Sequence, residues 1–166
     1  MDGKILFTAQ DGVHVLKFVG DVRVTLGPAI SSFLDRIGNC QFFRSITIDL
    51  SETVGIDSTS LGLLAKIAMR VDESFGAVPT IVSTNDDITR VLLSMGFDQV
   101  FVIVTDVGEG LTEVGGTSEV PCRAVSDEDM REQVLDAHRA LMSMNEANRV
   151  AFQDLVGALE AEAAAR

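Results

Sequence analysis

Two short stretches decide the fold of this chain: ITIDLS at residues 46–51 and IDSTSLG at residues 56–62. The first alternates apolar and polar residues, the pattern of a half-buried β-strand, and we expect this strand to end near Leu50. The second offers polar side chains from Asp57 to Ser60 that can cap a helix, and an apolar series at helical spacing follows. The sequence therefore predicts a strand, a short loop and a helix whose first turn carries hydroxyl groups beside a carboxylate.

The first turn of this helix is chemically suited to a phosphoryl group. Backbone N–H groups in a first turn have no partner inside the helix, and the helix dipole places partial positive charge at the same end. A phosphate on one of the hydroxyls would therefore lie where negative charge is already favoured. The alternative interpretation is an ordinary helix cap with no further role, because Ser and Thr are frequent caps.

The segment Asp57–Gly62 reads Asp-Ser-Thr-Ser-Leu-Gly and resembles the signature of STAS domains, specifically of bacterial anti-sigma factor antagonists. The resemblance implies that a partner kinase phosphorylates Ser58, with Thr59 and Ser60 as fallback sites. Ser60 stands where many members of the family carry glycine. The resemblance also implies that the partner binds at the segment Asp57, Ser58, Thr59, Ser60, Leu61 and Gly62, which we call the switch segment. We expect Asp49, at the end of the preceding strand, to help shape this loop.

Patterns on both sides of the switch segment complete an α/β domain. Asp11-Gly12 separates two strand-like runs and predicts a hairpin. Further strands are expected near residues 45–50, 78–82 and 99–105, and helices near 28–38, 58–71 and 85–95. A hairpin followed by alternating helices and strands predicts a mixed sheet of about four to five strands with helices packed against it. The resemblance implies the same STAS fold, and we assign this domain to residues 1–106.

The last third of the chain has a different character. Residues 107–125 are rich in Gly, Ser and Thr and predict a linker, and residues 126–166 predict a helical extension. Ser126 and Asp129 resemble a capping box, and no Gly or Pro follows before Gly157, so we expect one helix of about 30 residues, straight or bent. An apolar stripe with one Asn runs along it: Val134, Ala137, Leu141, Met144, Asn148, Ala151, Leu155 and Ala158. Docking on its own domain, a homodimer through this helix, and binding to another partner all fit this stripe.

Composition excludes several classes of function. The net charge of −12 argues against unspecific binding to nucleic acid or to anionic membranes. Cys40, Cys122, His14 and His138 belong to no metal-binding or nucleophilic motif, so we expect free thiols, no metal, no cofactor and no catalytic residue. The start of the chain shows no secretory pattern, and its apolar runs are too short to span a bilayer. We therefore expect a cytoplasmic protein without membrane insertion.

The resemblance implies a non-catalytic binding protein that is switched by phosphorylation, an anti-sigma factor antagonist. With Ser58 unmodified, the chain would sequester a serine kinase that acts as an anti-sigma factor. Phosphorylation of Ser58 by that kinase would end the binding, and a serine phosphatase would restore it. The alternative is a STAS scaffold or regulatory subunit of a signalling assembly or transporter without a sigma factor. A sensor that binds a small molecule is a third interpretation.

Overall fold

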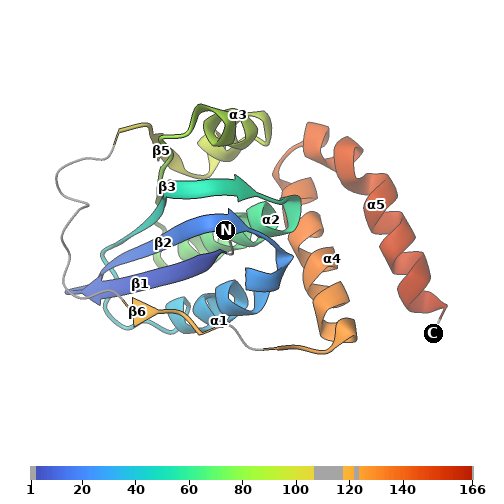
Figure 1. Cartoon of the computed structure of the whole chain (residues 1–166), viewed down its shortest axis with the longest axis horizontal. Helices are drawn as coiled ribbons and strands as arrows, with labels where there is room; N and C mark the ends of the chain where they lie inside the picture. Colours follow the sequence, from blue (N-terminus) through green and yellow to red (C-terminus); the bar gives the residue numbers. More distant parts are fainter. Residues whose placement is uncertain (1–2, 107–117, 122–123, 166) are drawn as a thin grey trace.

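The computed structural model describes residues 3–106, 118–121 and 124–165, and its centre is a sheet (Figure 1). Within these described residues, six strands lie in the order β5-β4-β3-β2-β1-β6. β1 pairs antiparallel with β2 and β6, whereas β2, β3, β4 and β5 are parallel. The bounds are β1 (Lys4–Gln10), β2 (Val13–Val22), β3 (Ser45–Ile56), β4 (Thr80–Val82), β5 (Val102–Val104) and β6 (Ser118–Glu119). The predicted mixed α/β sheet is confirmed, with one short strand more than expected.

The turn between β1 and β2 follows directly from its sequence. Asp11 and Gly12 have φ angles of 52° and 80°, so both residues of the turn adopt the left-handed region. A two-residue hairpin of this kind requires positive φ at both positions, and Asp-Gly meets that requirement at little cost. Gln10 therefore pairs with Val13, and the register of the whole hairpin follows.

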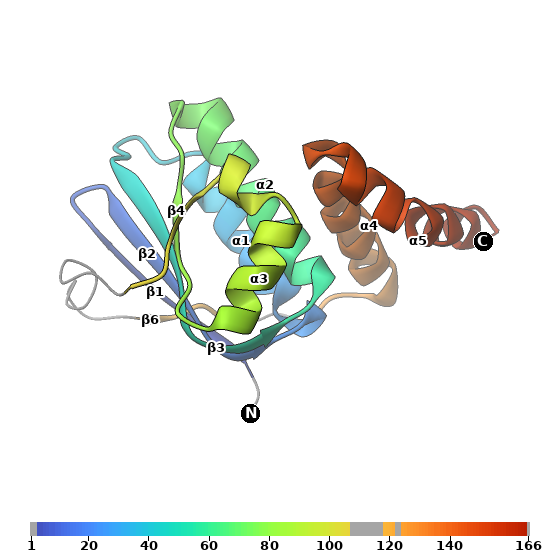
Figure 2. The same cartoon turned by 90° about the horizontal axis from the view of Figure 1, so that it is seen from above.

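Three helices cover one face of the sheet (Figure 2). They are α1 (Gly27–Ile37), α2 (Ser58–Phe75) and α3 (Asp86–Ser94), and each connects two parallel strands. Parallel strands need such crossovers, and the helices bury their apolar sides against the sheet. Two short turns of 3₁₀ helix, η1 (Val24–Leu26) and η2 (Phe97–Gln99), complete the domain. The core between the layers includes Leu16, Phe18, Ile30, Phe33, Ile48, Leu64 and Ile67.

The strand β3 is longer than its sequence pattern predicts. The expected end near Leu50 is wrong, because β3 continues to Ile56, which pairs with Val22 at the end of β2. Alternation of apolar residues stops earlier, but β2 is ten residues long and offers backbone partners beyond that point. Two register shifts between the strands, at Lys17/Val19 and Gly20/Asp21, accommodate the irregular second half.

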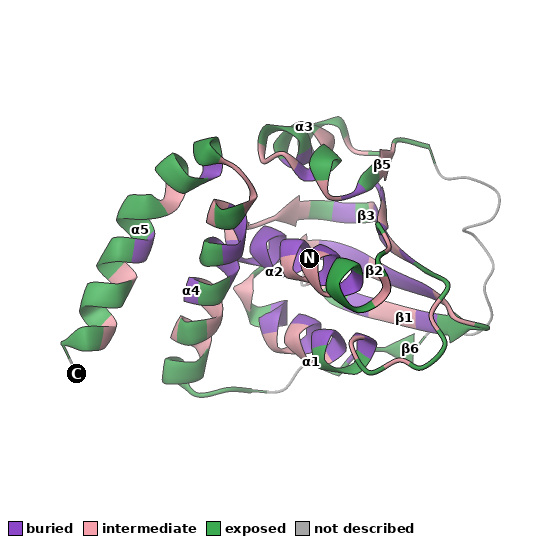
Figure 3. Cartoon of the chain, turned by 180° about the vertical axis from the view of Figure 1, so that it is seen from behind, coloured by how far each residue is buried: buried purple, intermediate pink, exposed green. Residues whose placement is uncertain are grey.

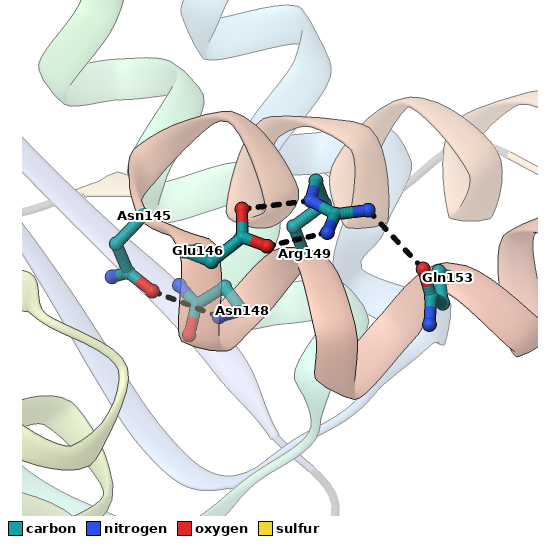
Figure 4. Close-up of polar contacts among 5 residues, drawn as sticks. All are labelled: Asn145, Glu146, Asn148, Arg149 and Gln153. Carbon is teal, nitrogen blue, oxygen red and sulfur yellow. Dashed lines mark hydrogen bonds and ion pairs between the residues drawn. The ribbon is translucent and has the colours of Figure 1, made fainter.

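The C-terminal extension forms two helices instead of the single helix expected. α4 (Asp127–Met144) and α5 (Glu146–Ala164) are separated by Asn145, whose φ and ψ of −163° and 167° are extended. The side chain of Asn145 accepts a hydrogen bond from the backbone N–H of Asn148 and so caps α5, next to an ion pair between Glu146 and Arg149 (Figure 4). Asn is a good N-cap but only a modest helix former, and Asn145 acts here as an N-cap. We call α4 and α5 together the C-terminal hairpin.

The C-terminal hairpin docks on its own domain. α4 lies beside α2, and α5 lies on the far side of α4 (Figures 1 and 3). The predicted stripe is buried at Ala137, Leu141 and Asn148, but Ala151 and Leu155 are exposed. The break at Asn145 resets the helical phase, so α5 buries Val156 instead. None of the helices in the described part of the chain is long and apolar enough to cross a membrane.

Candidate functional site

The switch segment lies where two parallel strands end. Asp57 directly follows β3, and its backbone N–H donates to the carbonyl of Val22, the last residue of β2, at 3.1 Å. The carboxyl ends of parallel strands are the usual place for binding sites in α/β sheets, because the loops there are held by the sheet yet remain at the surface.

The carboxylate of Asp57 fastens the start of α2. Its Oδ1 accepts from the backbone N–H of Ser60 at 2.8 Å, the bond of a helix N-cap. Its Oδ2 accepts from the backbone N–H of Val24 at 2.7 Å and so ties α2 to η1. The exposed Arg23 lies close by, and its pKa is raised mainly by a hydrogen bond to Asp21, with a smaller electrostatic contribution from Asp57. Of the candidate caps from Asp57 to Ser60, the structure uses Asp57, and both of its carboxylate oxygens accept hydrogen bonds.

The three hydroxyl groups of the switch segment differ in access to solvent. Ser58, the first residue of α2, is half-buried, whereas Thr59 and Ser60 are 6% and 0% exposed. The Ser60 hydroxyl has no hydrogen-bond partner among the described residues. Leu61 and Gly62 are buried against the rest of the fold. Ser58 is therefore the least buried of the three hydroxyl-bearing residues in this segment.

The hydroxyl of Ser58 meets His138 of α4. Ser58 Oγ lies 2.8 Å from His138 Nε2, and His138 Nδ1 lies 2.7 Å from the backbone carbonyl of Val134. A carbonyl can only accept, so Nδ1 carries a proton, and in the neutral ring Nε2 accepts from the Ser58 hydroxyl. The imidazole is 2% exposed, and its ring packs edge-on against Phe152 of α5, with ring centres 5.2 Å apart. The C-terminal hairpin thus holds the serine of the switch segment.

Sequence reasoning gave His138 no role. Its partner lies 80 residues away, and no local motif connects the two side chains. One signal was available: His138 directly follows Ala137 and stands four residues after Val134, which places it beside the predicted apolar stripe. That spacing indicates a buried face but does not identify the group that the imidazole contacts.

A serine hydrogen-bonded to a histidine is also the first part of a nucleophilic site. In hydrolases a carboxylate behind Nδ1 orients the imidazole and stabilises the imidazolium that forms during catalysis. Here the group behind Nδ1 is the carbonyl of Val134, which fixes the tautomer but carries no charge. The arrangement favours a structural contact between α2 and α4 over an activated nucleophile.

Asp49 lies apart from the switch segment. It occupies the middle of β3, where it is 6% exposed and pairs with Lys17 of β2 and Val82 of β4. Its Oδ1 accepts from the backbone N–H of Ser51 at 2.9 Å. The expected place at the end of the strand is therefore corrected, since the seven residues that follow Asp49 still belong to β3.

A separate cavity lies at the opposite end of β2. Its volume is about 220 Å³, and it is lined by Phe7, His14, Phe33, Arg36, Ile37 and Cys40. The Cys40 sulfur is 3.7 Å from His14 Nε2, and burial lowers the pKa of His14. In the described part of the chain no group of three or more His, Cys, Asp or Glu residues is placed to hold a metal ion.

Comparison with known proteins finds similarity to anti-sigma factor antagonists. No family model matches it. A Thermotoga neapolitana protein, named by homology as an anti-sigma factor antagonist, is 35% identical over 74 residues, which are 45% of this chain and 65% of that protein. The chain thus spans slightly less than two thirds of the length of this curated relative.

Solved structures show the same fold. An anti-sigma factor antagonist from Mycobacterium paratuberculosis superimposes with a TM-score of 0.56 at 22% identity, covering 67% of this chain and 92% of that one. The unphosphorylated form of the antagonist SpoIIAA gives a TM-score of 0.46 at 16% identity, over 63% and 89% of the two chains, a likeness too distant to add to the assignment. The resemblance predicted from the switch segment is confirmed, and this chain has the STAS fold of the anti-sigma factor antagonists.

Proposed function

We propose that this protein is an anti-sigma factor antagonist that binds a serine kinase of the anti-sigma type through the surface around Ser58. The kinase phosphorylates Ser58 and thereby releases itself, and a serine phosphatase restores the binding form. The protein is a switchable ligand in the cytoplasm and carries out no catalysis of its own. The observation that supports this proposal most is the place of Ser58, a half-buried serine at the first residue of a helix capped by Asp57.

The chemistry of the switch fits this place. The kinase transfers the γ-phosphoryl group of ATP, so that a bond forms between phosphorus and Ser58 Oγ, ADP leaves, and the hydroxyl proton passes to a base. The product carries about −1.5 to −2 charge at pH 7. The start of α2 tolerates this charge because its N–H groups and dipole favour an anion. The neighbouring carboxylate of Asp57 adds to the negative charge of this surface. The phosphate therefore acts mainly on a partner that docks here.

The fallback sites are less suitable. Thr59 and Ser60 point into the domain, where they are 6% and 0% exposed. A kinase would reach their hydroxyls only after the first turn of α2 had unfolded, and a phosphate there would be buried without enough partners. Ser58 is therefore the site that we assign to the kinase.

Capture from native cells tests the proposal. The full chain is used as bait with Ser58→Ala and Ser58→Asp, and Ser94→Ala, an exposed serine of α3, is the matched control. We expect Ser58→Ala and the control to retain an ATP-binding serine kinase, and Ser58→Asp to lose it because a fixed negative charge opposes docking. Equal capture by Ser58→Ala and Ser58→Asp would contradict the assignment of Ser58. Capture of transporter or scaffold subunits in place of a kinase would favour the scaffold alternative.

Mass spectrometry of the native protein supplies the second readout. The intact mass of the chain from its own cells, before and after phosphatase, shows whether it carries a phosphate, and fragmentation gives the position. We expect a phosphate on Ser58 that the phosphatase removes. A phosphate on Thr59 or Ser60 would move the switch by one or two residues and leave the class of function unchanged.

A further inference from the structure

The start of α2 is covered by α4 at backbone contact. A Cβ atom added to Gly62 would lie 2.1 Å from the carbonyl oxygen of Ala137. The helices therefore cross where one has a glycine and the other an alanine. A Cβ atom added to Gly27 would lie 2.0 Å from Gln133 Oε1, and Gln133 Nε2 donates to Ser31 of α1 at 2.7 Å. α4 therefore fits against both α1 and α2, and the crossing point lies inside the switch segment.

The tip of the C-terminal hairpin is fastened to the end of α3. The side chains of Asn145 and Asn148 both donate to the backbone carbonyl of Met95, at 3.2 and 2.9 Å. Asn148 is 3% exposed, and these bonds are the reason a polar residue fits within the apolar stripe. The hairpin is thus a built cover over α1, α2 and α3 rather than a loose appendage.

We infer that the C-terminal hairpin is an internal occupant of the partner-binding surface, so that a partner kinase and the hairpin exclude each other. The inference rests on the proposed function, because it takes the surface around Ser58 as the surface that the kinase binds. In the docked state α4 covers Gly62 with its backbone and Ser58 with the ring of His138. A kinase that reaches this surface displaces α4.

Phosphorylation of Ser58 requires the same displacement. With Ser58 oriented as it is, a phosphoryl group on its Oγ would overlap His138 Nε2, which lies 2.8 Å away. The imidazole is buried and is held between the Val134 carbonyl and the ring of Phe152, so it does not turn aside unless α4 moves. Undocking therefore precedes phosphorylation, and the phosphate in turn keeps the hairpin undocked, because coupling between two sites is reciprocal.

The docked hairpin has features of a reversible contact. Gln133 Oε1 is buried without a hydrogen-bond partner among the described residues, which costs free energy each time α4 docks. α5 buries only Asn148 and Val156, so the outer helix adds little apolar area of its own. The apolar contact with the domain comes mainly from Ala137, Ala140 and Leu141 of α4, so release of the hairpin exposes these side chains.

The contacts that α4 makes also indicate which groups a partner must present to this surface. Any group that replaces α4 meets Gly62 and the hydroxyl of Ser58 in the same places. The partner therefore presents backbone or a small side chain over Gly62, as Ala137 does, together with a hydrogen-bonding group for Ser58. A helix with a small residue at its crossing point has this chemistry.

Hydrogen exchange on the full chain tests the inference without any kinase. Phosphoserine is placed at position 58 during synthesis, and the control carries phosphoserine at exposed position 94. We expect the backbone amides of residues 134–141 to exchange about tenfold faster in the first protein than in the control, while β2 and β3 stay protected. Unchanged protection of α4 with phosphoserine at position 58 would overturn the inference, because the docked hairpin would then accommodate the phosphate.

A wedge variant gives a second route to the open state. Ala137→Leu puts a larger side chain at the crossing with α2, and Glu132→Ala on the exposed side of the same helix is the control. We expect faster exchange of α4 in the first variant alone. Once the kinase has been identified, its affinity for Ala137→Leu can be compared with its affinity for wild type. If the wild-type surface is open about one tenth of the time, the kinase should bind Ala137→Leu about tenfold more tightly. Equal affinity of the kinase for Ala137→Leu, with α4 shown to be open, would overturn the competition.

The outcomes distinguish failure of the proposed function from failure of the inference about the hairpin. Release of the hairpin by phosphoserine at position 58 without capture of any kinase would leave the internal contact standing and remove the proposed function. Capture of a kinase by Ser58→Ala together with an unchanged hairpin in the phosphoserine protein would do the reverse.

Discussion

Ser58 and His138, 80 residues apart in the sequence, are joined by a 2.8 Å hydrogen bond between Oγ and Nε2. The serine that we propose as the substrate of a kinase is thus the serine that the C-terminal hairpin holds. One oxygen atom serves the proposed phosphorylation and an internal docking contact, and the two uses exclude each other. If the proposed function holds, regulation of this chain depends on two equilibria, the phosphorylation of Ser58 and the docking of α4.

The bond between these side chains is measurable by a double-mutant cycle. Ser58→Ala, His138→Ala and the double variant are unfolded in urea as full chains. We expect His138→Ala to lower the free energy of unfolding by about 1–3 kcal/mol, because a buried ring and a hydrogen bond are lost. The coupling free energy between the two substitutions should be about 1 kcal/mol. Strict additivity would show that the contact contributes nothing to docking.

Gly62 and Gly157 provide a matched pair of glycines in helices. A Cβ at Gly62 collides with the backbone of Ala137, whereas a Cβ at Gly157 meets nothing within 4 Å. We expect Gly157→Ala to stabilise the chain by about 0.5–1 kcal/mol, as alanine usually does in an exposed helix. Gly62→Ala should destabilise it by about 1–3 kcal/mol and release α4, because α2 and α4 must separate. Stabilisation by both substitutions in urea unfolding would argue against close contact between the helices.

Local patterns predicted the parts of this fold that depend on neighbours in sequence. Asp11-Gly12 predicted a hairpin, and Asp57 was among the candidate caps, because turn and cap chemistry act over a few residues. The break at Asn145 was missed, since the same residue fits inside a helix unless its side chain finds Met95 and Asn148. The role of His138 was missed for the same reason: it is a contact between elements, and a single sequence records no such distance.

His14 should make stability depend on pH. Burial lowers its pKa below the ordinary value of 6.5, so the folded state stays neutral where the unfolded state already takes up a proton. The unfolded state then binds more protons, and the free energy of unfolding falls as the pH drops below about 6.5. His14→Phe is the comparison, because the ring already stacks with Phe7 and Phe43. Urea unfolding of both chains between about pH 7.5 and 5.5 should show a smaller loss in the variant. Parallel curves would mean that His14 does not contribute.

Asp57 holds the site together through two backbone hydrogen bonds, and a graded series separates them. Asp57→Asn keeps one acceptor oxygen, which can serve either Ser60 N–H or Val24 N–H, whereas Asp57→Ala keeps none. We expect losses in the free energy of unfolding of about 1 kcal/mol for Asn and about 2–3 kcal/mol for Ala. Asn85→Ala is the control, because Asn85 caps α3 through one bond, to Asp87 N–H. A loss for Asp57→Ala no larger than that for Asn85→Ala would show that the tie between α2 and η1 carries no stability. A larger loss would establish Asp57 as the residue that fixes the position of Ser58 before any partner or hairpin docks there.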